Sequence, residues 1–265
     1  MHSLHKGTAL ITGASSGIGA VYAAQLARRG YDLILVARNA AKLNELARNM
    51  TDETGMTIEV ATADLTHADD LARIETMLRT DSSITLLVNN AGVGATVPLL
   101  QSDVGSITTM ITLNVLAAAR LVHAAAPGFV ARGRGTIINI ASIVAVAPEL
   151  LNGIYGGSKA FLLAFSQSLQ HELGDKGVQV QVVLPGAVST PFWDLAGTPV
   201  DQLPEGIVMS AEHMVAAALA GLDAGETVTI PSLPDFADWT TYEAARAALA
   251  PGLSRSVPAP RYGIV

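Results

Sequence analysis

The chain of 265 residues contains no cysteine, which excludes disulfide bonds and thiolate metal sites. Its six histidines show no spacing typical of metal ligands. His171 and Glu172 begin the pattern of a zinc-protease helix, but Asp175 stands where the second histidine would be needed. The sequence therefore predicts a protein without a metal site.

Charge is also scarce, because only 15% of the residues are charged, and the net charge is −7. No stretch is rich in lysine and arginine, so nucleic acid is not an expected partner. The acidity is expected to serve solubility. Half of the residues are hydrophobic, which is typical of a parallel sheet that helices cover on both faces.

Long uninterrupted hydrophobic runs are missing as well. The segment Met1–Gly7 is polar and the apolar run after it stops at Thr12, so no signal peptide is expected. A membrane span needs about 20 consecutive apolar residues with few charges. The most hydrophobic long stretch, Ile111–Ala131, is better interpreted as a buried helix because it contains Asn114, Arg120, His123 and Pro127. We expect a cytoplasmic protein with no membrane partner.

What the chain does contain is a regular alternation of short apolar runs with longer helical patterns. Strands are expected at 8–12, 32–37, 57–62, 86–89, 136–140, 178–184 and 227–230, and helices at 17–29, 39–53, 68–79, 103–126, 155–173 and 211–223. This alternation predicts an α/β fold with a doubly wound, mainly parallel sheet of about seven strands. We see no repeat and no linker, so 1–265 is predicted to be a single domain. A last helix at 238–249 precedes a loosely held tail at 250–265.

The first expected strand ends in a glycine-rich turn with the spacing Gly-x-x-x-Gly-x-Gly, formed by Gly13, Gly17 and Gly19. Residues without a Cβ atom let phosphates approach the backbone. The helix that follows offers unpaired N–H groups and the positive end of its dipole. The turn therefore favours a phosphate-bearing ligand. It also matches the Gly-x-Ser-x-Gly motif of serine hydrolases at Ser15, but no upstream loop could supply their oxyanion hole.

Tyr155 and Lys159 lie four residues apart, on one face of a helix and one turn from each other. A free tyrosine titrates near ~10, and a neighbouring ammonium favours the phenolate and lowers that value. Ser142 lies thirteen residues before the tyrosine and could polarise a substrate oxygen. The three residues predict a proton-transfer site.

From Gly7 to about Pro191 the chain resembles the short-chain dehydrogenase/reductase family. The landmarks that carry the resemblance stand in the family's order, namely the glycine turn, Asp64-Leu65, Asn89-Asn90-Ala91-Gly92, Asn114, Ser142, Tyr155 with Lys159, and Pro185-Gly186. The resemblance implies a Rossmann-type domain. It also implies oxidoreduction of a carbonyl and alcohol pair with a nicotinamide cofactor.

The landmarks also agree with the expected topology, since ligands of a doubly wound sheet bind beyond the carboxyl ends of its strands. Five of the landmarks directly follow expected strands and should meet at one rim. The cofactor-binding residues expected there are Gly13, Ser15, Ser16, Gly17, Ile18, Gly19, Arg38, Asp64, Leu65, Asn90, Ala91, Gly92, Tyr155, Lys159, Pro185, Gly186, Val188 and Thr190.

The end of the second strand favours NADP over NAD. A carboxylate there would bind the ribose 2′-hydroxyl of NAD, whereas an arginine accommodates the 2′-phosphate of NADP. Arg38 stands at this end, and Asp32 lies at the other end of the strand. The alternative is that Arg38 only begins a solvated helix. By resemblance Asp64 hydrogen-bonds the adenine, or alternatively it caps the next helix. By resemblance Asn90 lines the cofactor cleft, or it closes a turn with Asn89.

Tyr155 is predicted to act as general acid/base, and Ser142 to stabilise the substrate oxygen as charge develops. Lys159 is predicted to lower the pKa of the tyrosine. The resemblance implies two further roles. Lys159 would hydrogen-bond the nicotinamide ribose, and Asn114 would hold a water that links Lys159 to solvent.

Apolar residues are expected at the nicotinamide end of the site. They are Val144, Val146, Leu150, Leu151, Pro191, Phe192, Trp193, Leu195 and Val200. They favour an apolar aldehyde, ketone or secondary alcohol, although the later ones could instead order only by packing or against a partner subunit. The segment 189–210 is expected to form a mobile lid.

Two of the expected helices, 103–126 and 155–173, are apolar around much of their circumference, so each is expected to be covered on more than one side. Because the family commonly pairs these helices across subunits, the resemblance implies a homodimer or homotetramer. A non-catalytic redox sensor that binds the dinucleotide is the alternative function, since the fold alone does not fix activity.

Overall fold

The computed structural model describes residues 6–204 and 206–264. Residues 1–5, 205 and 265, which belong to the predicted domain, lid and tail, lie outside the described residues. The chain divides into two units, of which the first ends at Pro231 and the second covers Ser232–Val265.

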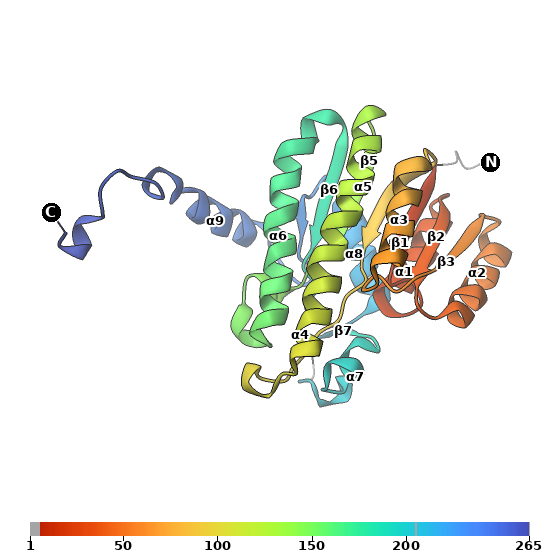
Figure 1. Cartoon of the computed structure of the whole chain (residues 1–265), viewed down its shortest axis with the longest axis horizontal. Coiled ribbons are helices and arrows are strands. Elements are labelled where there is room, and N and C mark those ends of the chain that lie inside the picture. Colours follow the sequence, from red (N-terminus) through yellow and green to blue (C-terminus); the bar gives the residue numbers. More distant parts are fainter. Residues whose placement is uncertain (1–5, 205, 265) are drawn as a thin grey trace. The chain divides into compact units, whose positions relative to one another are not determined.

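The first unit is built on a seven-stranded sheet in which each strand pairs in parallel with its neighbours, in the order β3-β2-β1-β4-β5-β6-β9 (Figure 1). The strands are β1 (Thr8–Thr12), β2 (Asp32–Ala37), β3 (Ile58–Thr62), β4 (Ile84–Asn89), β5 (Gly135–Ile140), β6 (Val178–Val183) and β9 (Val228–Thr229). The predicted doubly wound, Rossmann-type sheet is thereby confirmed. The strand order changes direction between β1 and β4, where such sheets form a ligand crevice.

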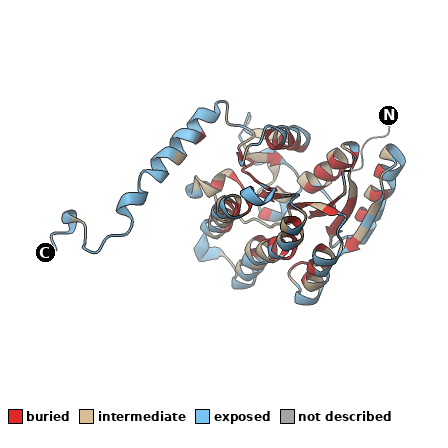
Figure 2. Ribbon diagram, turned by 90° about the horizontal axis from the view of Figure 1, so that it is seen from above, coloured by how far each residue is buried: buried red, intermediate tan, exposed pale blue. Residues whose placement is uncertain are grey.

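Helices cover both faces of this sheet. The helices of the first unit are α1 (Gly17–Arg28), α2 (Ala40–Thr54), α3 (Ala68–Thr80), α4 (Val104–Ile111), α5 (Ala118–Ala131), α6 (Gly153–Leu173), α7 (Phe192–Ala196) and α8 (Ala211–Asp223). One core contains Tyr22 of α1, Leu43 of α2 and Met214 of α8. A second core contains Ile74 of α3 and Phe129 of α5, together with residues of α6. Figure 2 shows the buried residues gathered in the strands and on the inner faces of the helices.

The prediction of one continuous α-helix over 103–126 is wrong, because a π-helical segment, Thr112–Ala117, separates α4 from α5. Such single π-turns are frequent at functional sites. Among the described residues, the joined run Val104–Ala131 is the one helix that could span a membrane by length and composition. In the first unit, α5 packs on α3 and α4 packs on α6.

Between β6 and α8 lies a small substructure that the sequence pattern did not predict. Strand β7 (Ala187–Ser189) pairs in parallel with β8 (Val208–Ser210), and α7 lies between them. Short 3₁₀ turns occur at Leu99–Gln101, Ile143–Ala145, Pro148–Leu150, Gly174–Lys176, Val200–Gln202, Ala250–Gly252 and Pro260–Tyr262. The predicted lid 189–210 therefore begins at the last residue of β7, contains α7 and ends with β8, and its mobility stays a prediction.

The second unit contains α9 (Phe236–Ala247), close to the predicted helix 238–249. Trp239 and Tyr242 stack on this helix with ring centroids 5.2 Å apart. Beyond α9 nearly every described residue is exposed, and the loose attachment of the tail stays a prediction.

Candidate active site

A cavity of about 730 Å³ opens at the carboxyl edge of the sheet. The segments that follow β1, β2, β3, β4, β5 and β6 all contribute to its lining. Of the predicted site residues, all except Gly19 and Asn114 line this cavity, and those two are buried. The residues predicted at one rim of the sheet therefore do meet in one place.

The glycine turn between β1 and α1 has the shape that its spacing suggested. Gly13 and Gly17 have φ values of +67° and +53°, which residues with a Cβ atom rarely adopt. A Cβ atom on Gly19 would collide with the carbonyl oxygen of Gly13. Ser16 precedes α1 and makes no side-chain capping hydrogen bond, so no side chain of the N-cap occupies the helix N-terminus. The turn thus presents backbone N–H groups to an anion.

Thr12 is a residue that the sequence analysis missed. Its hydroxyl donates to the carbonyl of Val88 and accepts the backbone N–H groups of Asn90 and Ala91, each at 3.0 Å. The Asn90 amide in turn donates to the carbonyls of Thr12 and Gly13. These bonds join the ends of β1 and β4 and hold Asn90 at the cavity. The sequence signal that could have identified Thr12 is a hydroxyl residue directly before the glycine turn.

Arg38 and Asp64 lie next to each other at the far end of the cavity. The Arg38 side chain is 73% exposed, and its Nη1 lies 3.9 Å from Oδ2 of Asp64. Burial opposes the ionisation of Asp64, but hydrogen bonds from Thr66 and the charge of Arg38 outweigh it and lower the pKa. Asp64 closes the turn before α3. The alternative that Asp64 caps this helix is wrong, because the N-cap of α3 is His67.

Tyr155 and Lys159 lie on one face of α6, as the four-residue spacing predicted, and both are buried. The Lys159 Nζ donates to the Ile140 carbonyl at 2.9 Å and lies 5.7 Å from the centroid of the tyrosine ring. Ser142 follows β5 and shares a hydrogen bond with the Tyr155 phenol. Its hydroxyl also lies 3.3 Å from the carbonyl oxygen of Pro185.

The pKa of Tyr155 is shifted in the opposite direction to the one expected from its lysine neighbour. Burial raises the pKa of Tyr155 to about 12, although its hydrogen bond with Ser142 opposes the shift. Burial lowers the pKa of Lys159 to about 8. The Lys159 Nζ lies 5.7 Å from the centroid of the ring, and its charge does not offset the loss of hydration of the tyrosine.

Asn114 lies in the π-helical segment with its amide fully engaged. Its Oδ1 accepts the N–H of Val93, and its Nδ2 donates to the Val93 carbonyl and to the hydroxyl of Ser158. Ser158 in turn donates to the carbonyl of Tyr155 at 2.8 Å. The water-holding role of Asn114 stays a prediction. Ser158, which the sequence analysis missed, connects Asn114 to the helix of Tyr155 and could have been noticed as a polar residue beside Lys159.

The cavity is apolar around Tyr155. Val144, Leu150, Leu151 and Pro191 line it, with Phe192, Trp193 and Leu195 of α7. The predicted lining residues Val146 and Val200 are not among the residues that the structure places on its wall. Among the described lining residues, Asp64 carries the one carboxylate, and it belongs to the Arg38 end. The cavity therefore joins a polar half with phosphate-binding features to an apolar half that contains the phenol.

Comparison with known proteins places these features in a family context. The family model described as "short chain dehydrogenase" matches residues 7–199. A short-chain dehydrogenase from Sphingobium yanoikuyae, solved in complex with NADPH, is 47% identical with a TM-score of 0.94, and the match covers 97% of this chain and 100% of that one.

Two further relatives differ in their printed activities. A bulky-bulky ketone specific alcohol dehydrogenase from Comamonas testosteroni is 45% identical with a TM-score of 0.90, over 98% of this chain and 99% of that one. A very-long-chain 3-oxoacyl-CoA reductase of Anas platyrhynchos is 34% identical over 209 residues, which are 77% of this chain and 67% of the relative.

Proposed function

We propose that the chain uses NADP(H) to interconvert apolar ketones and secondary alcohols. The premise is that the chain belongs to the short-chain dehydrogenase family and is thereby an oxidoreductase of alcohol and carbonyl groups. The observation that carries this proposal is the position of Tyr155, Lys159 and Ser142 between a phosphate-binding turn and an apolar pocket, within one cavity.

The residues at the polar half fit a dinucleotide with a 2′-phosphate. The glycine turn leaves room for a pyrophosphate at the N-terminus of α1. Arg38 is exposed at the end of β2, and its guanidinium can pair with a phosphate. The similarity to a dehydrogenase solved with NADPH supports the same choice for this chain. Asp64 is proposed to bind the adenine. Leu65, Ala91, Gly92, Pro185, Gly186, Val188 and Thr190 are proposed to complete the cofactor site.

When bound, the nicotinamide supplies the hydride, and the chain supplies position and charge. Tyr155 is proposed to donate its proton to the carbonyl oxygen during reduction and to accept it during oxidation. Ser142, which hydrogen-bonds the phenol, is proposed to bind the same substrate oxygen. The bond from Lys159 to the Ile140 carbonyl holds its Nζ 5.7 Å from the centre of the tyrosine ring, and its charge is proposed to stabilise negative charge that develops on the phenol during the reaction.

The apolar half of the cavity supports a ketone with hydrocarbon substituents over a sugar. The lining residues around Tyr155 offer few hydrogen-bonding groups for several hydroxyls. The similarity to an alcohol dehydrogenase specific for bulky-bulky ketones supports this substrate class.

We also propose that the protein is a cytoplasmic homodimer or homotetramer without a membrane partner. Val104, Ile111 and Leu116 expose apolar side chains along the run Val104–Ala131, and Phe161 and Phe165 stack on the partly exposed side of α6. Such a surface is suited to a second copy. Sedimentation of a monomer at micromolar concentration would contradict this assembly.

The proposed activity is tested by following NADPH absorbance with a panel of aryl and alkyl ketones and sugars, and ester hydrolysis is assayed separately with no nicotinamide present. We expect turnover with ketones, none with sugars and no ester hydrolysis. Arg38→Ala should raise the KM for NADPH at least ~10-fold and leave the KM for NADH nearly unchanged. If the protein binds NADPH tightly and reduces no carbonyl compound, the redox-sensor alternative replaces the enzyme.

A further inference from the structure

Phe192 is the aromatic residue that stands over the proposed acid/base. It is the first residue of α7, and its ring centroid lies 5.7 Å from that of Tyr155 at an angle of 43°. Its other side meets Trp193 edge to face, with centroids 5.6 Å apart. Phe192 therefore lines the cavity beside the ring of Tyr155.

Gly94 also lines the cavity and lies directly against this ring. A Cβ atom at residue 94 would overlap the outer ring carbons Cζ and Cε2 of Phe192. Gly94 is absent from the positive-φ glycines, so its backbone does not require glycine. The missing side chain is explained by the ring that occupies its place.

The backbone of α7 is held at both ends, so the ring is presented by a fixed support. The Trp193 indole donates to the Val188 carbonyl at 2.9 Å. At the other end, the Ala196 carbonyl accepts both the N–H and the hydroxyl of Thr96, at 3.0 and 2.9 Å. Thr198 adds a bond between its hydroxyl and that of Thr96 at 3.1 Å. These bonds connect α7 to the segment that carries Gly94.

We propose that Phe192 seated against Gly94 is the gate that sets which ketone substituents reach Tyr155. The inference rests on the proposed ketone reductase activity and deepens it. With the ring seated, the site accepts ketones that carry one small or flat substituent. A branched or polycyclic substituent on that side must displace the ring, which costs contacts with Gly94 and Trp193.

The first test changes the ring. The size ratio is kcat/KM for a ketone with two bulky substituents divided by kcat/KM for a methyl ketone. Phe192→Ala should raise this ratio at least ~10-fold over wild type. Phe192→Tyr keeps the ring and should keep the wild-type ratio. Phe236→Ala removes an exposed ring from α9 and serves as a matched control that leaves the ratio unchanged. The dissociation constant of NADPH, from nucleotide fluorescence, should stay within ~2-fold in all three variants because the ring lies away from the Arg38 end.

The second test couples the two partners. Gly94→Ala pushes the ring out of its seat and over Tyr155, so kcat/KM should fall at least ~10-fold for every ketone. In the Phe192→Ala background the same change has no ring to displace and should cost less than ~2-fold. A purely local effect of alanine at residue 94 would instead give equal losses in both backgrounds.

The gate is overturned if the effects of Gly94→Ala and Phe192→Ala on kcat/KM are additive, or if Phe192→Ala leaves the ratio of kcat/KM for the bulky and the methyl ketone unchanged. In either case, ketone reduction by the wild-type protein would leave the proposed function standing. A wild-type protein that reduces no ketone would overturn the proposed function first. If Gly94→Ala fails to fold, the melting temperature reveals it, and the size ratio of Phe192→Ala still decides the inference.

Discussion

At the scale of single residues, burial is the dominant influence on the pKa values of Tyr155 and Lys159. It raises the pKa of Tyr155 and lowers that of Lys159, so both side chains favour their neutral forms more than they would in water. The Tyr155 phenol therefore keeps its proton at neutral pH, as its proposed role as proton donor requires.

Removing the phenol should therefore abolish turnover without loosening the fold. We expect Tyr155→Phe to lower kcat by about 10³-fold or more, because the proton donor is lost. The NADPH dissociation constant should remain close to wild type by fluorescence titration. Retained ketone reduction in this variant would remove Tyr155 from the mechanism.

Lys159 should carry a stability cost that depends on pH. Its folded pKa of about 8 lies below the ordinary 10.5, so the folded state releases the proton first. Unfolding free energy should then rise with pH between about 8 and 10, since the unfolded chain binds more protons there. We expect Lys159→Met to abolish this rise in urea unfolding curves measured at pH 7 to 10. An equally steep rise in the variant would refute the assignment.

At the scale of elements, the π-helical segment turns Asn114 toward two partners at once. The Asn114 side chain satisfies both backbone groups of Val93 and contacts Ser158 of α6. One amide thereby joins the run α4–α5, the segment after β4 and helix α6. A regular α-helix through 112–117 would place residue 114 differently on its circumference.

Asn114→Ala should consequently cost both stability and activity. Loss of the partners of Val93 should lower the unfolding free energy by about 1–3 kcal/mol. The kcat should fall more than the KM rises, since Ser158 and the Tyr155 backbone lose their support. Thr108→Ala, on α4 and exposed, removes only a bond to the Val104 carbonyl and is the control. Equal effects of the two substitutions would argue against a special role for the π segment.

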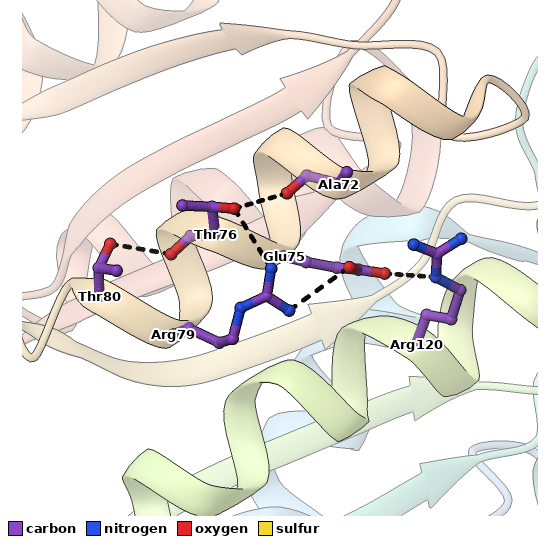
Figure 3. A network of polar contacts seen from close by, with 6 residues as sticks. All are labelled: Ala72, Glu75, Thr76, Arg79, Thr80 and Arg120. Atoms are coloured by element: carbon purple, nitrogen blue, oxygen red, sulfur yellow. Dashed lines mark hydrogen bonds and ion pairs between the residues drawn. The ribbon is translucent and has the colours of Figure 1, made fainter.

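At the scale of the whole molecule, a charged network connects two helices on one face of the sheet. Figure 3 shows Glu75 of α3 between Arg79 of the same helix and Arg120 of α5. Glu75 is buried, and its carboxylate lies 2.5 Å from Arg120 Nε and 3.4 Å from Arg79 Nη1. Burial opposes its ionisation, but the hydrogen bond and charge of Arg120 outweigh this and lower the pKa.

Breaking this network should destabilise the fold in a pH-dependent way. A depressed carboxyl pKa contributes stability above the ordinary value of 4.5, and this contribution is lost as pH falls through the depressed value. We expect Glu75→Gln to lower the unfolding free energy at pH 7 by about 1–3 kcal/mol. The difference from wild type should shrink below pH 4.5 in thermal unfolding. Glu53→Gln, which breaks an exposed pair with Arg28, should change nothing measurable.

Local patterns were enough to place most elements. The apolar runs at Thr8–Thr12 and Asp32–Ala37 end where the strands end, because a buried parallel strand must be apolar on both sides and glycine or charge stops it. The pattern missed β7, β8 and α7, which are 3 to 5 residues long and too short for any period to show. It missed the π segment because one extra residue in a turn leaves no mark in composition.

The sequence by itself determined the order of strands and helices, the glycine turn and the shared face of Tyr155 and Lys159, since each depends on neighbours within a few residues. Only the tertiary structure decided the pKa directions, the links through Thr12 and Ser158, and the meeting of Phe192 with Gly94. These depend on burial and on contacts between residues far apart in the chain, such as the 98 positions that separate Gly94 from Phe192. Periodicity carries no information about such pairs, because packing in three dimensions creates them.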